Sequence, residues 1–160
     1  STPVDLDGDG DLDTGLVCAI QDQSSSIQWI IGGNTQTTTN GGTSASIGQG
    51  QKNTKAMMGQ AGYTGGAAKV CNDYSITVNE ITYSDWFLPS KDELNQMYEH
   101  KAAINSAAAA NSGSNFSNVY YWSSTEYDNG SAWKQYFFNG FQDFHFIKDN
   151  SFNVRAVRAF

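Results

Sequence analysis

The segment LPSKDELNQMY, residues 88–98, constrains the fold of this chain more than any other. Ser90 and Glu93 have the spacing of a capping box, in which each side chain accepts a hydrogen bond from the other residue's backbone N–H group. Three apolar side chains would then share one face of the helix: Leu94, Met97 and Tyr98. The sequence therefore predicts a short capped helix with one buried face.

The remaining segments indicate an α+β fold with an antiparallel sheet. A second helix is expected over residues 65–74, where apolar residues recur at helical spacing. The Ala- and Ser-rich segment 102–118 is expected to be a fraying helix end followed by a loop. Short strand-like segments occur at 15–20, 27–31, 119–124, 131–138 and 154–160. Two early helices and a late cluster of strands are typical of α+β domains.

The composition and charge of the chain argue against two classes of partner, nucleic acid and membrane. The chain has 160 residues, the size of one domain, and a net charge of −7. No basic patch suited to nucleic acid is visible, and no apolar run reaches the length of a membrane span. We therefore expect no nucleic-acid partner and no direct membrane insertion. The Asn-, Ser-, Thr- and Gly-rich polar composition favours an extracellular, cell-surface or virion-surface location.

Two cysteines, Cys18 and Cys71, are too few for a disulfide scaffold. One bridge between them could form in an oxidising compartment. Two buried thiols that act as small apolar residues are an equally good interpretation. The sequence leaves both open.

Several separated motifs occur in the order seen in one family of bacterial and phage domains. They are DQSSSIQW (22–29), AAKVCNDY (67–74), YSDWFLPSKDELNQMY (83–98), YYWSSTE (120–126) and VRAVRAF (154–160). The chain resembles the family that includes the C-terminal domain of the Legionella collagen-like adhesin. This resemblance implies a C-type lectin-like fold over residues 15–160, with a small twisted antiparallel sheet, two flanking helices, long loops and paired terminal strands. Residues 1–14 would be an acidic lead-in or linker.

Some members of the family resemble the variable proteins of diversity-generating retroelements. The resemblance implies a constant frame and, beside it, a C-terminal surface that is diversified to bind ligands. The constant frame maps onto Ala132, Trp133, Gln135, Phe137 and Gly140. The positions between and beyond these residues would contact the ligand.

The aromatic stretch FFNGFQDFHFIKDN, residues 137–150, can be interpreted by strand alternation. Lys134 shares a face with Tyr136 and Phe138, and a lysine is seldom buried, so this face is expected to be exposed. Trp133 and Phe137 would then point into the core. Alternation is lost after Gly140, which predicts a surface loop.

The exposed rings and their polar neighbours together predict a ligand-binding surface. Such mixtures of rings with Asn and Asp are typical of antigen-binding loops. The predicted ligand-binding surface consists of Tyr127, Asp128, Asn129, Lys134, Tyr136, Phe138, Asn139, Phe141, Asp143, Phe144, His145 and Phe146. The alternative is a second small core beneath the loop of the 140s.

The acidic lead-in has carboxylates at alternate positions: Asp5, Asp7, Asp9, Asp11 and Asp13. Closely spaced carboxylates on a glycine-bent loop can bind calcium. However, Leu16 stands where an EF-hand-type loop has its bidentate glutamate. A calcium site and a solvated acidic linker are both compatible with the segment, and no other cofactor is expected.

No enzymatic motif accompanies the two histidines. Asp143 and His145 could form a pair, but no nucleophile or oxyanion-hole signature occurs with them. We therefore expect a non-catalytic domain that binds a protein or carbohydrate on another cell surface. The alternatives are the head of a polysaccharide-binding adhesin and a structural module that forms a homotrimer.

Overall fold

A five-stranded sheet forms the centre of the fold in the computed structural model, which describes residues 13, 15–32, 39 and 42–160. Its strand order is β2-β8-β5-β6-β7. The bounds are β2 (Ser24–Gln28), β8 (Ser151–Val154), β5 (Tyr120–Glu126), β6 (Ala132–Tyr136) and β7 (Gln142–Asp143). All neighbours are antiparallel except β5 and β8, which are parallel. The sheet was expected to be antiparallel throughout, but the parallel pair β5–β8 makes it a mixed sheet.

Two further sheets have two strands each. The terminal strands β1 (Leu16–Cys18) and β9 (Val157–Ala159) pair antiparallel, as the family resemblance implied. A hairpin that the sequence analysis missed consists of β3 (Ile76–Val78) and β4 (Ile81–Tyr83). The single strand expected over 154–160 was wrong. It is interrupted at Arg155 and Ala156, because the buried Arg155 side chain reaches towards Asp22.

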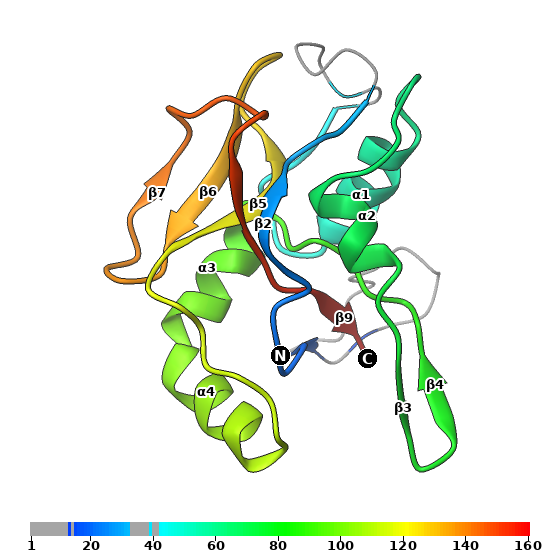
Figure 1. The fold of residues 1–160 in the computed structure, drawn as a ribbon, viewed down its shortest axis with the longest axis vertical. Coiled ribbons are helices and arrows are strands. Elements are labelled where there is room, and N and C mark those ends of the chain that lie inside the picture. The colour runs from blue at the N-terminus through cyan, green and yellow to red at the C-terminus, as the bar shows by residue number, and fades with distance from the viewer. Residues whose placement is uncertain (1–12, 14, 33–38, 40–41) are drawn as a thin grey trace.

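The described residues contain four helices, whereas the family resemblance implied two flanking helices. They are α1 (Gly50–Met58), α2 (Ala67–Asn72), α3 (Lys91–Glu99) and α4 (Lys101–Ala110). Figure 1 shows α1 and α2 side by side next to the central sheet, while α4 follows α3 away from it. The expected fraying end is the ordered helix α4, because its alanines favour helix and Ala108 is buried. The α+β class is confirmed.

The predicted capping box of α3 is confirmed. Ser90 Oγ accepts a hydrogen bond from the Glu93 N–H group, and the Glu93 carboxylate accepts one from Ser90. The same carboxylate accepts hydrogen bonds from the N–H groups of Gly48 and Gly50, at 2.8 and 3.3 Å. A Cβ atom on Gly50 would lie 2.2 Å from Glu93 Oε2, so this approach requires glycine. Glu93 therefore anchors the segment before α1 to the start of α3.

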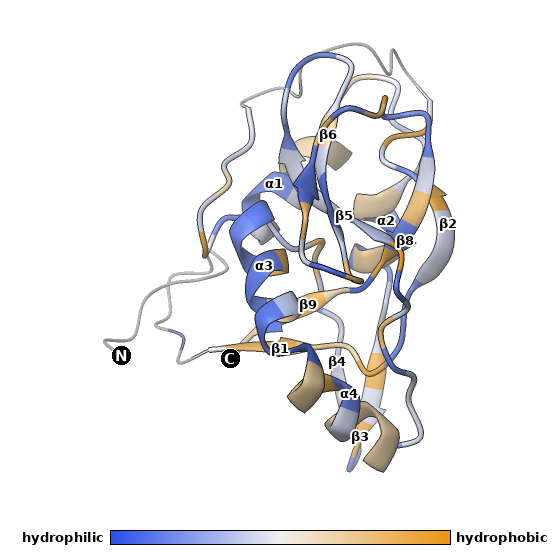
Figure 2. Cartoon of the chain, turned by 90° about the vertical axis from the view of Figure 1, so that its left-hand side faces the viewer, coloured by the Kyte–Doolittle hydropathy of each residue, from blue (hydrophilic) through white to orange (hydrophobic). Residues whose placement is uncertain are grey.

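Two adjoining clusters of buried side chains form the core. One contains Trp29, Leu88 and Trp122, and the other contains Phe87, Leu94, Met97, Phe116, Tyr121 and Phe137. In Figure 2, polar residues dominate α3, in agreement with a helix that buries only one face. The core therefore lies between the central sheet and the helices, and Phe137, directly after β6, points its ring into it.

Both cysteines are free thiols in the structure. Cys71 is buried, and burial raises the pKa of Cys18 to about 12. This arrangement matches the interpretation as small apolar residues. Within the residues described, no helix combines the length and apolarity needed to cross a membrane.

Candidate ligand-binding surface

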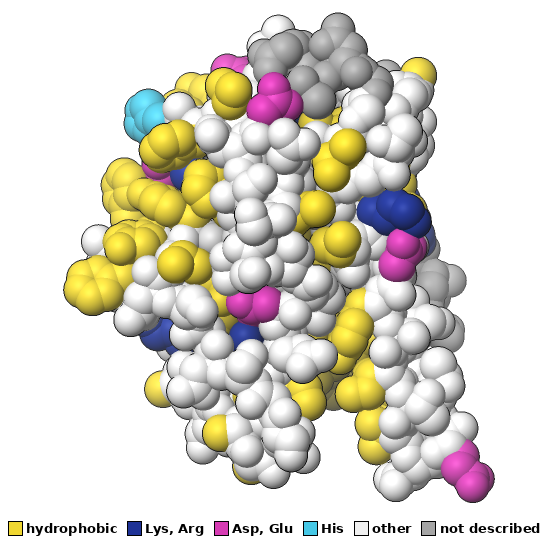
Figure 3. Space-filling view, in the orientation of Figure 1, with side chains coloured by type: hydrophobic (Ala, Val, Ile, Leu, Met, Phe, Trp, Pro, Cys, Tyr) yellow, Lys and Arg dark blue, Asp and Glu magenta, His cyan; other side chains and the backbone are white. Residues whose placement is uncertain are grey.

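Aromatic rings gather on one side of the molecule, over β6, β7 and the segment that follows (Figure 3). Phe138 is 64% exposed, Phe141 56%, Tyr127 50% and Phe146 44%. We call this patch the aromatic surface and define it by Tyr127, Tyr136, Phe138, Phe141, Phe144, His145 and Phe146. A contiguous exposed apolar patch usually marks a contact site.

The upper part of the aromatic surface is built by ring stacking. Phe144 stacks on Tyr127, with ring centroids 3.7 Å apart, and on His145, with centroids 4.6 Å apart. Trp133 lies edge-on against Tyr127 and Phe144. Trp133 is half-buried and belongs to neither core cluster, so the prediction that it points into the core was wrong; it packs against these two rings instead.

Lys134 is 1% exposed, so the expectation that its face is open to solvent was also wrong. Its Nζ lies 3.0 Å from Asp143 Oδ2 on the neighbouring strand β7. The rings of Tyr120, Phe146 and Phe152 surround the ammonium group at 4.4 to 5.7 Å. A lysine can be buried when a carboxylate and ring faces replace its water. The segment expected as a loop after Gly140 accordingly begins with a strand.

The Asp143 carboxylate joins Lys134 to His145. Asp143 Oδ1 accepts hydrogen bonds from the backbone N–H group of His145 and contacts its ring Nδ1 at 2.5 Å. Burial alone would raise the pKa of Asp143, but the hydrogen bonds from His145 and Lys134 outweigh burial and lower it to about 2. The His145 side chain is 72% exposed, so Asp143 fixes the orientation of a ring that is open to solvent.

We expect the stability that Asp143 provides to be lost in acid. The folded-state pKa of about 2 lies below the ordinary value of 3.8, so the ionised form stabilises the fold above about pH 4. This contribution, about 2–3 kcal/mol, disappears as the pH falls towards 2. Urea unfolding of the wild type and of Asp143→Asn should therefore differ at pH 6 and converge near pH 2. A difference that does not change with pH would contradict this assignment.

A second buried ion pair supports the turn between β5 and β6. Lys148 Nζ pairs with the Glu126 carboxylate and donates a hydrogen bond to the carbonyl oxygen of Asn129. Asp128 Oδ1 accepts hydrogen bonds from the N–H groups of Gly130 and Ser131. The predicted site residue Asp128 thus builds the turn, while Tyr127 and Asn129 are exposed on it.

The turn after β6 exposes Phe138 and Asn139. Asn139 Oδ1 accepts a hydrogen bond from the Phe141 N–H group, and Gly140 has a φ of +81°. A Cβ atom at Gly140 would lie 2.4 Å from the Tyr98 ring, so the close turn requires glycine. Tyr136 is half-buried and stacks on Tyr120, with centroids 4.8 Å apart.

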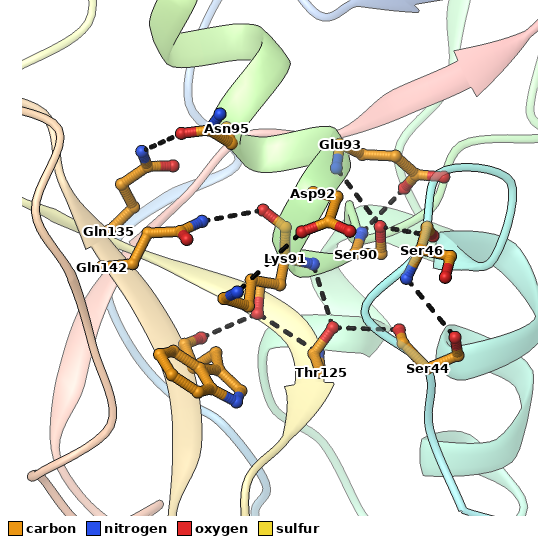
Figure 4. Close-up of polar contacts among 12 residues, drawn as sticks. Ser44, Ser46, Ser90, Lys91, Asp92, Glu93, Asn95, Thr125, Gln135 and Gln142 are labelled. Atoms are coloured by element: carbon orange, nitrogen blue, oxygen red, sulfur yellow. Dashed lines mark hydrogen bonds and ion pairs between the residues drawn. The ribbon is translucent and has the colours of Figure 1, made fainter.

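Hydrogen bonds fix β6 and β7 to the start of α3 (Figure 4). The Gln142 amide donates to the Lys91 carbonyl oxygen at 3.1 Å, and the Lys91 N–H group donates to Thr125 Oγ1 at 2.9 Å. Gln135 Nε2 donates to Asn95 Oδ1 at 2.8 Å. This support was not predictable from the sequence, because side chains that bond to distant backbone groups leave no local pattern. The aromatic surface therefore rests on an ordered frame.

The lead-in gives no described metal site. Asp5, Asp7, Asp9 and Asp11 lie outside the described residues, whereas Asp13 is described and buried. Within the described ranges, no three His, Cys, Asp or Glu side chains are placed to hold a metal ion. The calcium interpretation of the lead-in stays a prediction.

Comparison with known proteins places this geometry in a family. Residues 18–158 match the family model described as the Lcl C-terminal domain. The chain belongs to this family. The Lcl domain is the C-terminal domain of the Legionella collagen-like protein, and membership indicates a surface or extracellular location. Among curated proteins, none matches the chain.

Proposed function

We propose that this Lcl domain is a non-catalytic ligand-binding domain whose aromatic surface contacts a protein or carbohydrate on another cell. One observation carries the proposal: four rings, each 44–64% exposed, lie along the β6–β7 edge of a frame held by buried ion pairs. Rigid rings contribute a large contact area at low entropic cost. In this proposal Tyr127, Phe138, Phe141 and Phe146 contact the ligand directly, and Lys134 and Asp143 support them from beneath.

The charges of the surface favour binding over catalysis. Asp143 orients the His145 ring, but its other oxygen is committed to Lys134. The ammonium group of Lys134 thus already balances the charge of this carboxylate, so Asp143 does not act on the imidazole as an unpaired anion. Lys134 and Lys148 are both buried in ion pairs, so neither offers a free cation to an anionic glycan. These pairings favour an uncharged ligand surface.

Two finer points belong to the same proposal. The pairing of β1 with β9 supports a C-type lectin-like arrangement. The resemblance to the variable proteins of diversity-generating retroelements is the ground for proposing that residues 127–147 are diversified, and the exposed rings of Phe138, Phe141 and Phe146 lie within that range. Sequences of sibling proteins would test this point, since differences should concentrate in that segment over a constant frame.

The binding proposal can be tested with the double variant Phe138→Ser, Phe146→Ser. Fluorescently labelled domain is incubated with a panel of bacterial and animal cells, and bound fluorescence is titrated. We expect the affinity to fall at least about tenfold, because loss of central rings typically costs more than 1 kcal/mol each. The control is Ile47→Ser, Ile81→Ser, which removes two side chains of similar exposure outside the patch, 49% and 56%.

Equal cell binding by both double variants would contradict the proposal. Protease or glycosidase treatment of the cells separates protein from carbohydrate ligands. Sedimentation tests the structural alternative: a trimer that dissociates only in the Phe138→Ser, Phe146→Ser variant would show that the rings lie between subunits.

A further inference from the structure

The terminal strand β1 has an open edge. Gly15 exchanges backbone hydrogen bonds with Phe160, and the Ala19 N–H group donates one to the carbonyl oxygen of Ala156. Because antiparallel pairs alternate, the N–H and C=O groups of the intervening Leu16 and Cys18 point away from β9. On its other side β9 is bonded to Phe87 through Val157. In the described part of the chain, no backbone group pairs with the outward groups of Leu16 and Cys18.

An apolar groove lies on each side of this edge. The groove beside α4 has a volume of about 310 Å³ and is lined by Leu16, Ile20, Ala103, Ile104 and Ala107, among others. The groove beside the β3–β4 hairpin has a volume of about 260 Å³. Its lining includes Val17, Ile76, Val78, Tyr83 and Trp86. Figure 3 shows the corresponding recess between the α4 lobe and the projecting hairpin, with hydrophobic side chains on its walls.

We propose that the open edge of β1 accepts an extended apolar segment of a partner polypeptide as an added strand. The outward groups of Leu16 and Cys18 offer two donors and two acceptors, and a polypeptide partner in extended conformation can satisfy all of them together. Alternate side chains of an added strand point to opposite faces. They would therefore enter the α4 groove and the hairpin groove in turn.

The shape of the recess selects a single strand over a second copy of this chain. The edge lies between two walls, α4 and the hairpin, which project on either side of it (Figure 3). Edge-to-edge pairing of two copies would bring the walls of both copies to the same place, and the net charge of −7 on each copy opposes the approach. The Arg158 guanidinium beside the hairpin groove is paired with Asp85. The groove thus favours apolar side chains over acidic ones.

The test uses a phage-displayed library of random linear peptides selected on the whole domain. We expect the selected peptides to carry apolar residues at alternate positions. Synthetic copies N-methylated at alternate residues should lose binding in one register and keep it in the other, since only one edge of the peptide bonds to β1. Hydrogen exchange at Leu16 and Cys18 should slow when the peptide is bound.

Matched substitutions locate the peptide. Ala107→Glu and Val78→Glu place a charge in each groove and should weaken peptide binding at least tenfold. Ala109→Glu and Thr77→Glu are exposed neighbours on the same elements and should leave binding unchanged. Peptides that bind all four variants equally, or a library that yields no alternating apolar peptide, would overturn the proposal. Self-association abolished by Ala107→Glu would also overturn it, by making a second copy the occupant. The Phe138→Ser, Phe146→Ser variant should still bind the peptide. The proposal for the β1 edge and the proposal for the aromatic surface can therefore be tested separately.

Discussion

Replacement of Arg155 with alanine is expected to lower the free energy of unfolding by about 3–5 kcal/mol. Arg155 is 1% exposed, and its Nε lies 2.6 Å from Asp22 Oδ1. Its Nη1 also donates a hydrogen bond to the carbonyl oxygen of Ser114 at 3.0 Å. The guanidinium therefore joins three segments: the chain before β2, the segment before β5, and the break between β8 and β9.

The loss of stability arises from the Asp22 carboxylate, which remains in place when Arg155 is removed. The Asp22 carboxylate also accepts hydrogen bonds from the Tyr121 hydroxyl at 2.8 Å and the Asn153 amide at 2.9 Å. These neutral donors cannot balance its charge. Burial, followed by the charge of Asp22, raises the pKa of Tyr121 to about 12, so the hydroxyl stays a neutral donor. Without Arg155, a largely buried carboxylate has no opposite charge.

Arg158→Ala is the matched control. Arg158 forms two hydrogen bonds of 2.7 Å with Asp85, a better aligned pair than that of Arg155. However, the side chains of Arg158 and Asp85 are 18% and 39% exposed, so water compensates their separation. We expect a loss of no more than about 1 kcal/mol. Urea unfolding of both variants measures the difference, and equal losses would show that alignment rather than burial decides the cost.

The basic residues near the C-terminus pair with acids that no local pattern identifies. Arg158 pairs with Asp85, 73 residues away, and Lys148 pairs with Glu126. The partner of Arg155 is Asp22, 133 residues away. Such a pair depends on which strands become neighbours, and no spacing in the sequence encodes that.

The features that could be predicted reliably depend on residues that are close together in the sequence. The capping box of α3 depends on residues three apart, so the sequence contains all of it. The burial of Lys134 depends on Asp143, which reaches it only because β7 pairs with β6. A two-residue strand has no periodicity to detect. The aromatic surface was therefore predictable as a set of rings, while the ion pair that supports it was not.

Phe137→Ala and Phe138→Ala should differ greatly in their effect on stability, although the two residues are adjacent in the sequence. We expect Phe137→Ala to lower the free energy of unfolding by about 3–5 kcal/mol, the usual cost of removing a buried ring. Phe138→Ala should change it by no more than about 0.5 kcal/mol, as expected for an exposed surface position. Both substitutions remove the same atoms, so the difference reports their environments alone.

The structure gives the reason in the contacts of each ring. Phe137 is fully buried, and its ring centroid lies 4.6 Å from those of Phe116 and Tyr121 and 5.6 Å from that of Tyr98. The ring therefore joins α3 to β5. Phe138 is 64% exposed, and its described ring contact is with Tyr136, at 6.0 Å.

Thermal and urea unfolding measure the stability of both variants, and the cell-binding titration measures their function. Phe137→Ala should lose stability, and Phe138→Ala should lose affinity with its stability intact. If Phe138→Ala also unfolds the domain, the ring belongs to a second core and the aromatic surface is not free to bind. If Phe138→Ala changes neither stability nor affinity, the ligand contacts lie nearer Tyr127 and Phe144. The pair of variants therefore distinguishes a residue of the frame, Phe137, from a residue of the binding surface, Phe138, although the two are adjacent in the sequence.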